Sequence, residues 1–207
     1  MNNATVWQSI RRGAGLIARP QGRDSRAQFW PYAVAVWLGV ALLSVALAVP
    51  YILSTLTNMA RLAAQYPDQF VVLRGPGSIE YRYIGNDPAI TAQLMPDMAV
   101  VALITLVVFG LSAAAVVRRL HDRGWSGWWC AVPMVLALAG YANMAAMFGQ
   151  IGPHLDPNSP ALIRLFLQQA AINITYLISV AILLVQLARP GVAGDNLYGP
   201  PTGGTPP

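Results

Sequence analysis

Four long apolar runs, separated by more polar segments, dominate the pattern of the chain. Each run has room for the roughly 20 apolar residues with which a helix crosses the hydrocarbon core of a bilayer. The pattern predicts an all-α membrane protein with four transmembrane helices, at about 30–56, 98–120, 127–148 and 165–188. A polar arm of residues 1–26 precedes this membrane domain of residues 27–189, and a Gly- and Pro-rich flexible tail of residues 190–207 follows it.

The connection of residues 58–97 is expected to form the first outer loop. It contains two β-prone runs on either side of the turn residues Gly75-Pro76-Gly77. This arrangement predicts a β-hairpin over residues 70–84, outside the membrane. Because two isolated strands are marginally stable in water, we expect the hairpin to rest on neighbouring helix ends or on the lipid interface.

Single residues indicate where the predicted helices begin and end. Asp97 is expected to cap the amino end of the second span, and Ser126 that of the third. Pro50 is expected to kink or end the regular part of the first span. Residues 149–160 are rich in Gly, Pro and Asn and should form a loop.

The distribution of charge predicts which side of the membrane each segment faces. Charged residues make up 10% of the chain, and all 13 basic residues are arginine. The arm, the segment 118–123 and residues 189–207 hold nine arginines and three acidic residues, whereas the opposite side holds four arginines and five acidic residues. The positive-inside rule therefore predicts that both termini are cytoplasmic. Since the arginines flank apolar spans, we expect anionic lipid headgroups as partners rather than nucleic acid.

Three polar motifs resemble those of a known family. They are G-R-D-S-R-A-Q-F-W at 22–30, R-R-L-H-D-R-G-W-S-G-W-W at 118–129 and P-G-V-A-G-D-N-L-Y-G-P at 190–200. Over roughly residues 20–201 the chain resembles the domain of unknown function 805 family, small bacterial inner-membrane proteins. The resemblance implies a multi-pass protein of the bacterial inner (plasma) membrane, and it implies no particular activity.

All three motifs fall on the predicted cytoplasmic face, which suggests one composite site. Arginine forks suit phosphate or carboxylate groups. We expect Asp122 to pair with Arg23 or Arg26, with Arg118 and Arg119 as the alternatives, and the tail to fold over the top. The candidate lipid- or partner-binding residues are Arg23, Arg26, Arg118, Arg119, His121, Asp122, Arg123, Asn196 and Tyr198. The alternative interpretation is that these arginines only anchor the topology.

These observations favour a non-enzymatic protein that binds lipid or a protein partner through its Arg-rich face. One alternative is a small-solute channel or transporter built as an oligomer, although the four apolar runs that form the interiors of the predicted spans contain no charged residue. A weaker alternative is a membrane-interface enzyme that uses His121 and Asp122.

Other chemistries have less support in the sequence. The G-x-S-G at 124–127 is similar to the serine motif of rhomboid-type proteases, but no predicted span supplies a facing histidine. We expect neither a metal nor a cofactor, because Cys130 is the only cysteine and His154 is predicted on the opposite face from His121.

Overall fold

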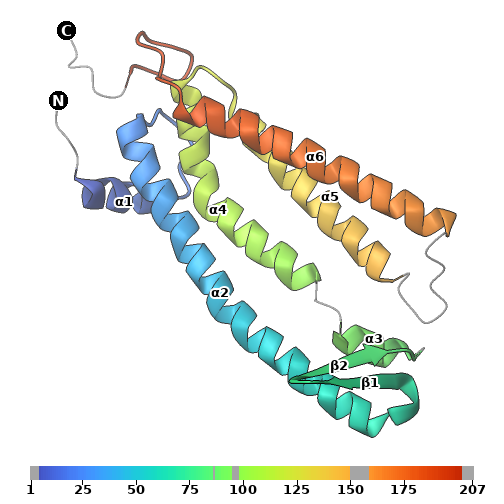
Figure 1. Ribbon diagram of the computed structural model, residues 1–207. Coiled ribbons are helices and arrows are strands. Elements are labelled where there is room, and N and C mark those ends of the chain that lie inside the picture. The colour runs from blue at the N-terminus through green and yellow to red at the C-terminus, as the bar shows by residue number, and fades with distance from the viewer. Residues whose placement is uncertain (1–4, 86, 95–97, 150–158, 202–207) are drawn as a thin grey trace.

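The computed structural model describes residues 5–85, 87–94, 98–149 and 159–201. Within these ranges, four helical segments are long and apolar enough to span a bilayer. They are α2 (Arg26–Gln65), α4 (Met98–Asp122), the 3-10 turn η2 (Gly127–Cys130) continuing into α5 (Ala131–Phe148), and α6 (Pro160–Ala188). They run side by side, with α4 between α2 and α5, and α5 against α6 (Figure 1). The predicted four-span helical architecture is confirmed.

Helix α2 is longer than the span that the sequence predicts. Its 40 residues correspond to about 60 Å at 1.5 Å per residue, twice the roughly 30 Å of a hydrocarbon core. The helix continues through Pro50 instead of ending there, and it curves along its length (Figure 1). Residues 58–65, expected in the outer loop, are therefore helical.

The far end of α2 carries the predicted hairpin. Strand β1 (Phe70–Gly75) pairs antiparallel with β2 (Ser78–Tyr83), and Gly77 turns the chain with a φ of 78°. Figure 1 shows the hairpin beside the end of α2, with the short helix α3 (Pro88–Leu94). A small apolar core joins these elements and contains Leu62, Ala63, Phe70 and Ile90. Both the hairpin and its support by a helix end are confirmed.

The arm contains a helix that the sequence analysis did not predict, α1 (Val6–Gly15). A capping box between Thr5 and Gln8 begins it. The hydroxyl of Ser9 donates to the carbonyl of Ala27 at 3.2 Å. That carbonyl is free because Pro31, four residues later in α2, has no N–H to bond it. The docking of α1 on α2 thus uses a backbone group that a proline leaves unpaired.

Gly13 allows α1 to approach α2 closely. A Cβ added at Gly13 would lie 2.8 Å from the Cβ of Tyr32. The Tyr32 side chain is held in place, because its hydroxyl donates a hydrogen bond to the carbonyl of Leu111. We expect Gly13→Ala to loosen α1 and to raise the rate of amide hydrogen exchange in residues 6–15. In Gly15→Ala the added methyl meets nothing within 4 Å, so this control should gain only helix propensity. Equal exchange in the two variants would contradict the close packing.

One predicted helix cap is confirmed, and two other sequence predictions concern residues that the structure does not describe. Ser126 begins η2, and its hydroxyl accepts a hydrogen bond from the Trp128 amide at 3.4 Å, so the predicted cap is confirmed. The predicted cap at Asp97 and the predicted position of His154 lie outside the described residues.

Candidate functional site

The arm, the turn after α4 and the tail meet at one end of the bundle (Figure 1). Five charged side chains are buried there, between 0% and 4% exposed. We call this set the buried charge cluster; it consists of Arg23, Asp24, Arg118, Arg119 and Asp122. The apolar core of the bundle adjoins it, since Phe29, Leu120 and Leu187 pack together at the same end.

Asp122 is the centre of one half of the cluster. Its Oδ1 accepts a hydrogen bond from Nε of Arg23 at 3.1 Å, and its Oδ2 accepts one from Arg119. Its backbone carbonyl accepts the amide of Val192 at 2.9 Å. The predicted pairing of Asp122 with Arg23 is confirmed, and Arg119 pairs with the same carboxylate. Asp122 therefore joins the arm, the end of α4 and the tail.

Asp24 is the centre of the other half, and the sequence analysis did not select it. Its Oδ2 accepts a hydrogen bond from Nε of Arg118 at 2.7 Å, and Oδ1 accepts one from Arg12 of α1. Its amide donates to the carbonyl of Arg118 at 3.2 Å. The signal available in the sequence was an acidic residue between Arg23 and Ser25, just before the first span.

Backbone carbonyls take most of the remaining donors of the three buried arginines. A guanidinium carries five N–H donors in a fixed plane, and such a group needs several partners once it leaves water. The accepting carbonyls belong to Leu16 and Arg19 for Arg118, to Leu187, Arg189 and Asp24 for Arg119, and to Val192, Gly194 and Gly199 for Arg23. These arginines therefore hold the arm and the tail together and offer few free donors to an external phosphate.

The tail folds over the end of α4, as expected from Asn196 and Tyr198. The ring of Tyr198 stacks on His121 with 3.7 Å between centroids and 3° between planes. The side-chain amide of Asn196 donates to the carbonyl of His121 at 2.9 Å. Nδ1 of His121 lies 3.2 Å from the carbonyl of Gly22. All three motifs thus contribute to one folded surface.

A glycine of the tail permits this closure. A Cβ built at Gly191 would lie 2.7 Å from Cγ of Asp122 and would overlap its carboxylate oxygens. Only a residue without a side chain therefore lets the tail pass directly over the buried charge cluster.

Two of the predicted arginines lie outside the cluster. Arg26 is exposed and has no hydrogen-bond or ion-pair partner among the residues that the structure describes. Arg123 is partly exposed and donates to the carbonyl of Pro190. Arg11, Arg19 and Arg189 are also exposed, and no carboxylate within the described ranges pairs with their guanidinium groups.

His121 and Asp122 do not form a catalytic pair in this geometry. Both carboxylate oxygens of Asp122 are occupied by arginines, and the ring of His121 is held by Gly22 and Tyr198. Across the described part of the chain, no group of three His, Cys, Asp or Glu side chains is placed to hold a metal ion. The buried charge cluster therefore positions the arm, the turn after α4 and the tail relative to one another.

Comparison with known proteins gives one match. A family model described as protein of unknown function (DUF805) matches residues 17–200, which include all three motifs. Neither a curated protein nor a solved structure gives a significant match.

Proposed function

We propose that this chain, which belongs to the DUF805 family of unknown function, is a non-enzymatic, multi-pass membrane protein that binds anionic lipid headgroups. The binding surface in this proposal is the end of the bundle at which the arm, the turn after α4 and the tail meet. We further propose that this surface faces the cytoplasm of a bacterial inner membrane, because it carries the larger share of the arginines.

The proposal rests on the difference between two sets of arginines at this end of the bundle. Those of the buried charge cluster are paired with carboxylates and carbonyls, whereas a second set is exposed and unpaired within the described ranges. The exposed set consists of Arg11, Arg19, Arg26 and Arg189. An arginine near an anionic membrane surface contributes about 1 kcal/mol of attraction. The buried cluster holds the segments that carry this set, and the exposed set can bind phosphate.

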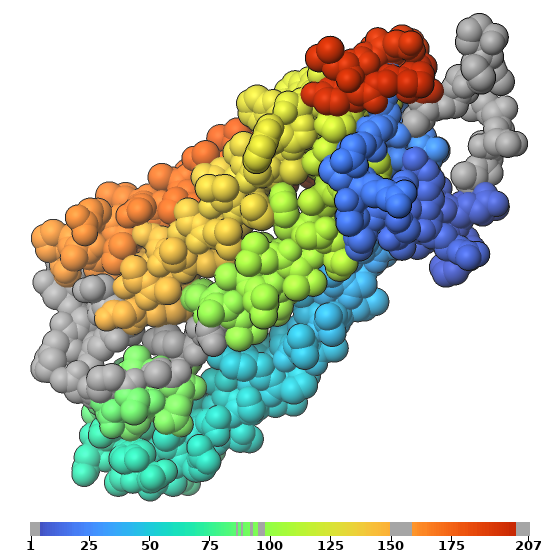
Figure 2. Space-filling model, turned by 180° about the vertical axis from the view of Figure 1, so that it is seen from behind, coloured from blue at the N-terminus to red at the C-terminus, as the bar shows by residue number. Residues whose placement is uncertain are grey.

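Helix α1 supports the choice of lipid as the partner. Its apolar side chains Val6 and Trp7 are 65% and 64% exposed, although Ser9 and Gly13 on the neighbouring face are buried against α2. Arg11 follows Trp7 by one helical turn, so an exposed aromatic ring and an exposed arginine lie on the same side of α1, a pair that suits a membrane interface. Figure 2 shows this N-terminal segment and the tail at the same end of the molecule.

The proposal is tested by the lipids that the protein retains. We expect the protein purified from mixed phosphatidylcholine and phosphatidylglycerol vesicles to retain phosphatidylglycerol preferentially, as measured by mass spectrometry. Neutralising Arg11, Arg19 and Arg26 together, each to Gln, should lower that preference by about tenfold or more, because each contributes about 1 kcal/mol.

The matched control neutralises three arginines of the opposite end, Arg61, Arg74 and Arg82, which are exposed as well. This variant should keep the preference for phosphatidylglycerol. An equal loss in both variants, or no loss in the first, would contradict headgroup binding and leave the arginines as topology anchors. If a second protein is retained with this one and no lipid is enriched, the result would instead favour a protein partner.

A further inference from the structure

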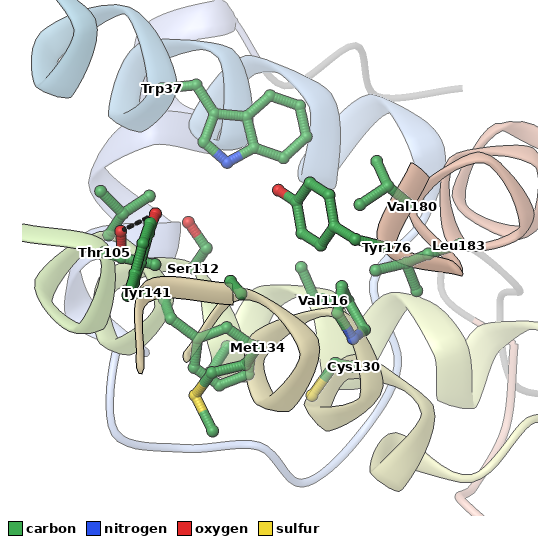
Figure 3. Close-up of a pocket in the computed structure, with 15 residues that line it drawn as sticks. Trp37, Thr105, Ser112, Val116, Cys130, Met134, Tyr141, Tyr176, Val180 and Leu183 are labelled. Atoms are coloured by element: carbon green, nitrogen blue, oxygen red, sulfur yellow. Dashed lines mark hydrogen bonds between the residues drawn. The ribbon is translucent and has the colours of Figure 1, made fainter. Parts of the chain in front are cut away.

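A cavity of about 360 Å³ lies inside the bundle, apart from the Arg-rich end. Its walls come from four spans, and none of its lining residues is charged. Figure 3 shows Trp37 of α2, Tyr141 of α5 and Tyr176 of α6 around it, together with Ser112 of α4. Its volume falls within the roughly 300–1,000 Å³ of small-molecule pockets.

The cavity lies at the depth of the hydrocarbon core. Ser112 and Thr105, which both line it, precede Arg118 in α4 by six and thirteen residues. At 1.5 Å per residue these positions are about 9 and 20 Å from the buried charge cluster along the helix. An uncharged, mostly apolar site at this depth favours a ligand that is soluble in the bilayer.

Two hydroxyl groups at this cavity lack partners. Ser112 is 8% exposed, and its Oγ has no hydrogen bond to any described residue. The hydroxyl of Tyr176 likewise has no hydrogen bond within the described ranges. By contrast, the hydroxyls of Thr105 and Tyr141 bond each other at 2.9 Å. Because a buried hydroxyl without a partner costs about 1–3 kcal/mol, the buried Oγ of Ser112 indicates that a ligand oxygen completes the site, and the partly exposed hydroxyl of Tyr176 offers a second donor.

We propose that this cavity binds a lipid-soluble molecule with a flat ring that bears carbonyl oxygens, the chemical class of the membrane quinones. The aromatic walls favour a flat ring, and the hydroxyls of Ser112 and Tyr176 donate to carbonyl oxygens. A neighbouring cavity of about 370 Å³ shares Ala137, Tyr141 and Tyr176 as walls and provides room for an apolar tail. This site is independent of headgroup binding at the Arg-rich end.

The test measures binding to the full chain in lipid nanodiscs, with two probes that have the same tail and a flat six-membered ring, of which only one bears carbonyl oxygens. Decyl-benzoquinone should bind the wild-type protein more tightly than decylbenzene does. Ser112→Ala should weaken the binding of decyl-benzoquinone about fivefold, the value of one hydrogen bond, and leave the affinity for decylbenzene unchanged. Ala137→Leu places extra atoms in the shared wall and should abolish the binding of the quinone.

The control is Ser44→Ala, a serine of α2 that does not line this cavity. It should bind decyl-benzoquinone as the wild type does. Equal affinity for the two probes, with no effect of Ser112→Ala, would show a nonspecific apolar site and overturn the proposal. Failure of decyl-benzoquinone to bind the wild-type protein would overturn it as well. Thermal unfolding of each variant, followed by circular dichroism, verifies that the bundle remains folded.

Discussion

Replacing Asp122 by Asn is expected to release the arm and the tail from the end of α4 while the chain stays inserted in the membrane. Asparagine keeps one acceptor oxygen, and it places an NH₂ donor opposite the N–H of either Arg23 or Arg119. Both buried guanidinium groups then lose their negatively charged partner, and one of them also loses its hydrogen-bond acceptor. Breaking a buried pair in this way costs about 3–5 kcal/mol. The apolar spans are unchanged, so insertion should be retained.

Limited trypsin digestion measures this release. Cleavage after Arg23 requires the arm to open, because Arg23 is buried. When opening and closing are fast, cleavage follows the open population, and the expected cost corresponds to a rise of about two to three powers of ten. Asp195→Asn is the control, since Asp195 is exposed on the same tail and pairs with no described residue. Unchanged cleavage in Asp122→Asn would show that the cluster does not hold the arm.

Gly191→Ala is expected to detach the tail from the end of α4. The added methyl overlaps the carboxylate of Asp122, which cannot move away because Arg23 and Arg119 hold both of its oxygens. The tail must shift instead, and it then loses the hydrogen bond from the Val192 amide to the Asp122 carbonyl. Overpacking of a well-packed site costs about 1–3 kcal/mol.

Hydrogen exchange at the Val192 amide reports the state of the tail. We expect exchange about tenfold to a hundredfold faster in Gly191→Ala, together with easier chymotrypsin cleavage after Tyr198. Gly194→Ala is the matched control, because its added methyl meets nothing within 4 Å. If both variants exchange alike, the close approach at Gly191 does not determine the position of the tail. Trypsin should cleave after Arg23 less readily in Gly191→Ala than in Asp122→Asn, because Arg23 keeps its bond to the Asp122 carboxylate when the tail shifts, and this separates the two effects.

Parts of the candidate site were accessible from the sequence because they depend on short-range chemistry. A lone acidic residue among arginines at the end of a span needs a charged partner, and this reasoning selected Asp122 and Arg23 correctly. The same reasoning could not separate Arg23 from Arg26. In the structure Arg23 points into the cluster and Arg26 is exposed. That choice depends on where α2 begins, with Arg26 as its first residue.

The four spans and the hairpin followed from the sequence alone. The length of an apolar run relative to the hydrocarbon core, the period of apolar residues and the turn residues Pro76-Gly77 are local properties. None of them depends on distant segments of the chain. Only the tertiary structure decided that Asp24 and Arg118, 94 residues apart, share a buried ion pair, and that Gly191 must lack a side chain. It also decided which arginines are buried and bonded to carboxylates and carbonyls, and which are exposed and have no partner among the described residues. Burial and hydrogen-bond saturation depend on which segments meet, and no spacing along the chain specifies that.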